Sequence, residues 1–188
     1  MGRPSLTEQR RIEICRALQI CMMEKGSYEA TSVKDIAQKG GMAAGLIHHY
    51  FTSKDEILLT TADIALLSVQ NSLDDLLHTR NIERRRDKLH ELLHDEAQSR
   101  FLLMLYSLAL SMPAIRELIL SKHHELEDAL TARLRRSRTF TGDPAQKAGE
   151  LMFLLEAAVL QSALSENNRA DRLLADLLEQ LFPSVSDA

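Results

Sequence analysis

The sequence predicts an all-α protein, and three observations carry this prediction. Glycine and proline are scarce, at 7 and 4 of 188 residues, whereas helix formers such as Leu, Ala, Glu and Arg are plentiful. Apolar residues recur at helical spacing, as at Ile14, Ala17, Leu18, Cys21 and Met22. No stretch shows the alternating pattern of a half-buried strand. We therefore expect about nine helices.

Three of these helices fall within residues 1–52. The first is expected over about 6–25, behind a serine-glutamate capping box. The second follows a cap at Thr31 or Ser32 and ends at Gly40-Gly41, because glycine takes the left-handed backbone of a tight turn. The third is expected over about 43–50. Two short helices joined by a glycine turn indicate a helix-turn-helix.

The rest of the chain, residues 53–188, is predicted to form a second, all-helical domain. The stretch at 99–111 is apolar all round, so we expect it to be buried on every side. Capping residues, prolines and breaks set the other limits. The expected helices lie at about 53–78, 81–97, 99–111, 113–136, 143–164 and 169–182.

Charge and cysteine content narrow the class of protein. Net charge is −4, yet residues 1–56 hold 8 Lys and Arg against 7 Asp and Glu, a weak hint of a polyanionic partner. Cys15 and Cys21 lie six apart in one helix, so no disulfide is expected. The polar start predicts no secretory signal, and the longest nearly uncharged run is too short for a membrane span. We expect a cytoplasmic protein without a cofactor.

Residues 12–60 resemble the TetR family of helix-turn-helix regulators. The resemblance rests on "EKGSYEATSVKDIA", the glycine turn and "GLIHHYFTSKDEIL" in that order. It implies a homodimer that binds a palindromic double-stranded DNA operator and is released by a small-molecule effector. Three departures stand out. Ser27 is an extra residue, Gly41 is a second glycine that adds slack to the turn, and Ala43-Ala44 replaces a common Ser-Lys.

The DNA contacts are expected around the third helix. Small residues there allow a close approach to phosphates, Leu46 suits a thymine methyl, and the histidines suit phosphate or guanine N7. Ile47 and Phe51 would anchor the helix. Arg3, Arg10 and Arg11 are candidates for an arm over the minor groove, although a solvated terminus is the simpler reading. The predicted contacts are Thr31, Ser32, Ala43, Ala44, Gly45, Leu46, His48, His49, Tyr50 and Lys54.

Two further surfaces are predicted in the second domain. An apolar pocket for a small hydrophobic effector would be lined by Phe101, Met104, Leu105, Leu108, Met152, Phe153 and Glu156, although each also suits a plain core position. A four-helix dimer interface would use Leu151, Leu155, Leu173, Leu177 and Leu181.

One motif favours a different class of protein. His90-Glu91-x-x-His94 spells the zinc-peptidase sequence, in which two histidines one turn apart bind zinc and the glutamate activates water. No metzincin continuation follows, and the intervening leucines suit an ordinary amphipathic helix. The zinc hydrolase stays as the outsider, and we expect no catalytic or metal site. Arg84-Arg85-Arg86 is expected to be a solvated run, with salt bridges to the acidic second domain as the alternative.

Overall fold

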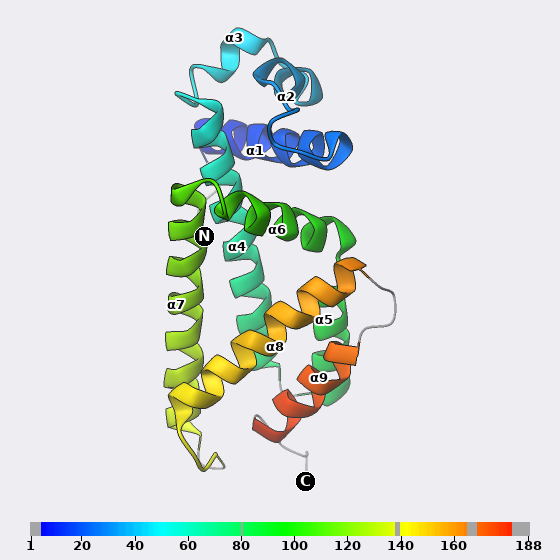
Figure 1. The fold of residues 1–188 in the computed structure, drawn as a ribbon, viewed down its shortest axis with the longest axis vertical. Helices are drawn as coiled ribbons and strands as arrows, with labels where there is room; N and C mark the ends of the chain where they lie inside the picture. The colour runs from blue at the N-terminus through cyan, green and yellow to red at the C-terminus, as the bar shows by residue number, and fades with distance from the viewer. Residues whose placement is uncertain (1–4, 80, 138–139, 165–168, 182–188) are drawn as a thin grey trace. The chain divides into compact units, whose positions relative to one another are not determined.

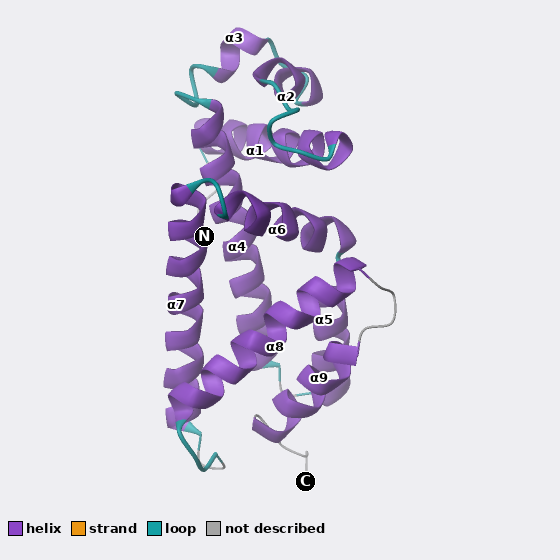
Figure 2. Ribbon diagram, viewed as in Figure 1, coloured by secondary structure: helices purple, strands orange, loops and turns teal. Residues whose placement is uncertain are grey.

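The computed structural model confirms the all-α prediction (Figure 1). It describes residues 5–79, 81–137, 140–164 and 169–181. Within these residues the chain forms helices and connecting loops and no strand (Figure 2). The helices are α1 (Leu6–Lys25), α2 (Val33–Lys39), α3 (Ala44–Ile47), α4 (Lys54–His78), α5 (Ile82–His94), α6 (Glu96–Ala109), α7 (Pro113–Arg136), α8 (Pro144–Leu164) and α9 (Arg169–Leu181).

Local hydrogen bonds set the ends of α1 and α2 as the sequence predicts. The Ser5 hydroxyl accepts from the Glu8 backbone N–H at 3.2 Å, and the Glu8 carboxylate accepts from the Ser5 N–H at 2.7 Å. Gly26 ends α1 with a φ of 75°. Ser32 caps α2 in a second capping box, with Asp35 as its partner. Each box satisfies backbone donors that the first turn leaves unpaired.

Packing divides the chain into two compact units, each of which is described by itself. The first unit contains residues 1–65 and 104–118, and the second contains 66–103 and 119–188. The first turns of α4 belong to the first unit, where Ile57 is buried and its carbonyl accepts from the Cys15 Sγ at 4.0 Å. The boundary predicted after residue 52 remains a prediction.

In the first unit, α2 packs on both α1 and α3 (Figure 1). One face of each helix supplies apolar side chains to a shared core, as their spacing predicts. The largest fully buried side chains in these elements are Ile14, Leu18, Met22, Ile36, Ile47, Phe51, Ile57 and Leu58.

In the second unit, α8 packs on α9 and on α5, and α5 also packs on α9 (Figure 1). Leucine and alanine dominate the buried positions, which suits closely approaching helices. The core of this unit includes Leu73, Leu76, Leu93, Phe101, Leu134, Ala148, Ala158 and Leu178.

The expectation that 99–111 is buried on every side is wrong. Phe101 and Leu105 are fully buried, but Ser107 is exposed and Leu110, in the turn after α6, is 86% exposed. The polar residues in this stretch lie on an exposed side of the helix, which the high apolar content of the sequence obscures.

No helix among the described residues combines the length and apolar character that a bilayer crossing requires.

Candidate nucleic-acid interface

The α2–α3 turn depends on both of its glycines. Gly41 takes a φ of 64°, in the left-handed region that L side chains rarely adopt. Gly40 has an ordinary φ of −80°, but a Cβ there would lie 2.9 Å from Met42 Cε and 3.3 Å from the Ile36 carbonyl oxygen. The expectation that Gly41 merely adds slack is therefore wrong, because this residue supplies the reversal of the chain.

Helix α3 is shorter than predicted, with one α-helical turn at Ala44–Ile47 followed by turn structure to Tyr50. Ile47 and Phe51 are fully buried and anchor it, as predicted. The opposite side carries Ala43, Ala44, Gly45, Leu46, His48 and His49, and all six are exposed. The structure therefore brings these six predicted DNA contacts onto one surface, which we call the α3 face.

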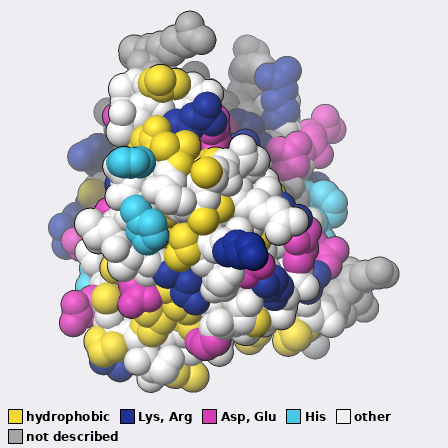
Figure 3. All heavy atoms as spheres, turned by 90° about the horizontal axis from the view of Figure 1, so that it is seen from above, with side chains coloured by type: hydrophobic (Ala, Val, Ile, Leu, Met, Phe, Trp, Pro, Cys, Tyr) yellow, Lys and Arg dark blue, Asp and Glu magenta, His cyan; other side chains and the backbone are white. Residues whose placement is uncertain are grey.

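His48 and His49 are the polar groups of the α3 face. Neither imidazole makes a hydrogen bond or ion pair within the described residues, so both ring nitrogens are available to an external partner. Viewed from above, histidine side chains lie at the surface among hydrophobic and uncharged groups (Figure 3). An imidazole can donate to a phosphate oxygen or to guanine N7, as DNA recognition requires.

Tyr50 is half-buried, and its backbone carbonyl accepts a hydrogen bond from Arg11 Nη1. The same guanidinium stands 4.0 Å from the centroid of the Phe51 ring and donates from Nη2 to Glu56 Oε1 at 3.1 Å. Arg11 thus fastens the end of α3 to α1 and α4, and it is not available as an arm. Arg3 lies outside the described residues.

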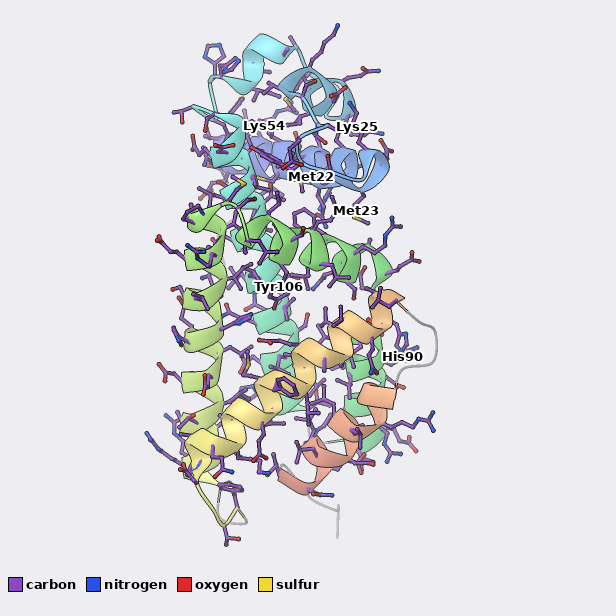
Figure 4. The ribbon with its side chains drawn as sticks, viewed as in Figure 1. Met22, Met23, Lys25, Lys54, His90 and Tyr106 are labelled. Atoms are coloured by element: carbon purple, nitrogen blue, oxygen red, sulfur yellow. The ribbon has the colours of Figure 1, made fainter. Side chains whose placement is uncertain are left out.

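Lys54 lies at the start of α4, but it points into its own unit (Figure 4). Its Nζ donates to the carbonyls of Tyr28 at 2.9 Å and Thr31 at 2.8 Å, and stands 3.8 Å from the centroid of the Tyr28 ring. Two carbonyl acceptors and an aromatic face satisfy an ammonium group well. Lys54 therefore holds the α1–α2 loop, and a phosphate contact would compete with these bonds.

The two predicted DNA contacts at the start of α2 differ in their exposure to solvent. Thr31 is 1% exposed, and its hydroxyl donates to the Ser27 carbonyl at 3.1 Å, so its side chain belongs to the interior. Ser32 is exposed, and its hydroxyl both caps α2 and donates to Asp35 at 2.6 Å. Ser27, the extra residue in the loop, supplies the acceptor for Thr31.

Most of the lysine and arginine side chains in residues 5–65 have partners within their own unit. Arg16 and Lys34 have no hydrogen-bonding or ionic partner among the described residues. The other five lysines and arginines are bound within the unit: Arg10 to Glu13, Arg11 to Glu56, Lys25 to Asp35, Lys39 to Glu24, and Lys54 to the two carbonyls. The α3 face is therefore nearly neutral apart from its histidines.

The predicted effector pocket stays a prediction, and none of its residues lines the hollow of about 1120 Å³ that lies mainly against α4 and α7 in the second unit. Phe153 is 72% exposed, and Glu156 pairs with His123 at 3.1 Å. Phe101 and Met152 are buried among core residues. Met104, Leu105 and Leu108 belong to the first unit.

The predicted dimer-interface leucines also differ in their exposure to solvent. Leu151, Leu155 and Leu181 are buried in the core of their own chain, so they cannot face a partner. Leu173 is 52% exposed and Leu177 is intermediate. The exposed apolar side chains of these two helices are Phe153, Leu160, Leu164 and Leu173, which we call the α8–α9 patch.

The zinc motif gains no support from its surroundings. His90 and His94 are exposed on α5, with ring centroids 4.1 Å apart, and His90 projects from the helix (Figure 4). Among the described residues, no group of three or more His, Cys, Asp or Glu side chains is arranged to hold a metal ion. Leu92 and Leu93 are core residues, as an ordinary amphipathic helix requires.

Sequence reasoning missed the role of Arg85. It is only 6% exposed, and its guanidinium donates twice to the Thr79 carbonyl, so the expectation of a solvated run is wrong for this residue. Its spacing from Leu89, Leu92 and Leu93 places it on the buried face of α5, which is the signal that could have revealed it.

Comparison with known proteins agrees with this geometry. A family model described as "Bacterial regulatory proteins, tetR family" matches residues 21–61. Residues 21–61 therefore resemble the amino-terminal segment of TetR-family regulators. This segment contains α2, the glycine turn, α3 and the start of α4, so it covers the whole α3 face. The match favours the regulator and gives the zinc hydrolase no support.

Two curated relatives and one solved structure extend the TetR comparison. The chain is 30% identical over 69 residues to the HTH-type transcriptional regulator PksA of Bacillus subtilis (strain 168), covering 37% of this chain and 33% of PksA. It is 40% identical over 58 residues to the HTH-type transcriptional regulator HbdR of Aromatoleum sp. (strain CIB), covering 31% of this chain and 25% of HbdR. The similarity thus spans a third or less of these relatives.

The solved structure is a TetR transcription regulator from Haloarcula marismortui ATCC 43049. It matches with a TM-score of 0.74 at 18% identity, over 93% of this chain and 97% of that chain. At this identity the likeness shows that the two proteins share a fold.

Proposed function

We propose that this protein is a ligand-responsive transcriptional repressor that binds a palindromic DNA operator as a homodimer. The observation that carries the proposal is the α3 face, whose small residues and exposed histidines lie on α3 and the turn that follows it, anchored by Ile47 and Phe51. The TetR match over residues 21–61 supports the same conclusion. An α-helix presenting such groups fits the major groove, where base edges differ most.

A homodimer would place two α3 faces about one DNA turn apart, roughly 34 Å or a multiple of it. The α8–α9 patch is the surface we propose for that dimer. Phe153, Leu160 and Leu164 follow one another at helical spacing on α8, and such an exposed apolar stripe is unusual on a monomer. A two-fold interface buries this stripe against the same stripe of the partner.

The dimer proposal is tested by light scattering on Phe153→Asp. The variant should be a monomer at concentrations where the unmodified protein is a dimer. Leu110→Asp is the control, because Leu110 is at least as exposed as Phe153 but lies in the α6–α7 turn. A dimeric Phe153→Asp protein would exclude this patch.

DNA binding is tested by a gel shift with the DNA upstream of the protein's own coding region. The unmodified protein should retard this fragment, and unlabelled fragment should compete better than random DNA of the same length. Stoichiometric zinc in the purified protein together with no shift would overturn the proposal. An effector releases the DNA if it favours a conformation of the dimer in which the distance between the two α3 faces no longer matches the spacing of the DNA grooves.

The alternative is an activator, or a regulator without a small effector. Both use the same α3 face, so the gel shift does not separate them from the repressor. A reporter gene placed behind the bound fragment does, because a repressor lowers expression and an activator raises it.

A further inference from the structure

The side chains of the α3 face match few of the base edges in DNA. This face consists of two alanines, a glycine, a leucine and two histidines. In the major groove Arg and Lys pair with guanine, Asn and Gln with adenine, and Glu and Asp with cytosine, whereas apolar side chains contact the C5 methyl group of thymine. The α3 face contains none of those six polar residue types. Apart from the imidazoles, its side chains are suited to the thymine methyl group.

Backbone hydrogen bonds place Leu46 in the middle of this face. The Ala43 carbonyl accepts from the Leu46 N–H at 2.9 Å, and the Leu46 carbonyl accepts from the His49 N–H at 3.1 Å. Hydrogen bonds between residues three apart bring their side chains to the same side of a helical turn. Ala43, Leu46 and His49 therefore form one row, in which an apolar side chain stands next to a polar one.

Leu46 is exposed although it is a large apolar side chain. Its exposed fraction is 38%, whereas its neighbour Ile47 is 1% exposed and belongs to the core. A Cβ added at Gly45 would meet nothing within 4 Å, so the space beside Leu46 is open. Ala43 and Ala44 add only methyl groups. A base edge can therefore approach Leu46 closely without meeting a long side chain from residues 43–45.

The residues beneath the α3 face hold Leu46 in place. Ile47 and Phe51 are buried on the opposite side, and the Phe51 N–H donates to the Ile47 carbonyl at 3.0 Å. Apolar contact requires heavy atoms within about 4.0–4.5 Å of each other, so a side chain that recognises a methyl group needs a fixed backbone. The anchored turn provides this backbone.

Contact between Leu46 and a methyl group does not depend on charge. The α3 face carries no lysine, arginine or carboxylate. Phosphate contacts release counterions and weaken as salt is added, whereas an apolar contact releases none. A base preference that arises from Leu46 should therefore be independent of the salt concentration, even though the affinity for DNA is not.

We propose that Leu46 is a specificity-determining residue for thymine, and that each half of the operator presents at least one thymine methyl group to it. This inference rests on the proposed function, because it names the base that the regulator recognises. Ala43 packs on the edge of the same methyl group, and His49 binds the neighbouring base or phosphate. The α3 face thus distinguishes thymine from uracil, which pairs in the same way but lacks the methyl group.

The test uses the DNA upstream of the protein's own coding region, prepared once with thymidine and once with deoxyuridine in its place. Both nucleosides pair with adenine, so the two fragments differ only in their C5 methyl groups. The thymidine fragment should bind about fifteenfold more tightly, since burial of one methyl group is worth about fourfold and a two-fold dimer makes the contact twice. Gel shifts over a series of protein concentrations measure this ratio of affinities.

Variants of the exposed leucines assign the ratio to one side chain. Leu46→Ala should lower the ratio to less than about threefold, because the shortened side chain no longer reaches the methyl group. Leu46→Met keeps the apolar volume and should retain at least half of the ratio. Leu110→Ala is the matched control, because Leu110 is also an exposed leucine of the first unit but lies outside the α3 face. This control should show the same ratio as the unmodified protein.

Equal affinity for the two fragments would overturn the inference, as would an unchanged ratio in a Leu46→Ala protein with native circular dichroism. A ratio that falls towards one between about 50 mM and about 200 mM KCl would also overturn it, because an apolar contact releases no counterions. If neither fragment is retarded, the proposed function fails and its base preference fails with it. The experiment therefore separates a wrong function from a wrong contact.

Discussion

The α3 face of the first unit and the hollow that lies mainly against α4 and α7 in the second unit differ in the cations that they contain. The α3 face is proposed to meet polyanionic DNA, yet it carries two histidines and no lysine or arginine. The hollow, by contrast, is lined by three arginines, Arg85, Arg133 and Arg136. Residues 5–65 contain seven such cations, but five are bound to carboxylates or carbonyls inside the unit. The number of lysines and arginines in a segment therefore does not show where an unpaired positive charge lies, because the folded structure decides which of these side chains have partners.

The sharpest test of this comparison removes both histidines. His48→Ala with His49→Ala should weaken operator binding by roughly 30- to 150-fold, since two contacts to phosphate or base are lost at about 1–1.5 kcal/mol each. Fluorescence anisotropy with labelled operator measures it. His90→Ala with His94→Ala, the exposed pair on α5, is the matched control and should bind normally. Normal binding by the first variant would show that the histidines are not the contacts.

Lys54→Ala distinguishes a structural lysine from a DNA-binding one. Loss of its bonds to the Tyr28 and Thr31 carbonyls should lower the free energy of unfolding by about 2 kcal/mol. Urea denaturation measures this. Lys34→Ala is the control, because Lys34 is exposed without a partner in the described chain, and its stability should change by less than about 0.5 kcal/mol. An unchanged stability in Lys54→Ala would return Lys54 to the list of phosphate contacts.

The two glycines on either side of Ala43-Ala44 should respond differently to a methyl group. Gly41→Ala forces an L residue to a φ of 64° and should cost about 1–2 kcal/mol in urea denaturation. Gly45→Ala meets nothing within 4 Å and should stabilise the fold by about 0.5 kcal/mol. If Gly45→Ala nevertheless weakens DNA binding, Gly45 approaches the DNA backbone. Equal stability of both variants would contradict the role assigned to Gly41.

Acid should lower the free energy of unfolding of the first unit as the pH falls below about 4. Lys25, followed by Ser32, lowers the pKa of Asp35 below its ordinary value. A lowered folded-state pKa gives stability that is present above the ordinary value near 4 and is lost as pH falls through the folded one. The urea midpoint of Asp35→Asn should therefore lie below that of the unmodified protein at pH 7, and the difference should shrink below pH 4. A constant difference would contradict this account.

Much of the fold follows from local sequence. The capping box at Ser5 and the breaks at Gly26 and Gly40-Gly41 are short-range signals, and the structure realises each of them. The anchors Ile47 and Phe51 also followed from spacing alone. Local hydrogen bonds and helical periodicity act over a few residues, so they can be read without the fold.

The sequence by itself determined the helices, the α3 face and the TetR resemblance. Only the tertiary structure decided which polar side chains remain available. Lys54 and Arg11 lie near the expected DNA contacts, but their partners are Thr31, Tyr50 and Glu56, which are 23 to 45 residues away. Arg85 and Arg133 are 48 positions apart and line one hollow. Such pairings depend on how helices pack, and no spacing along the chain encodes them.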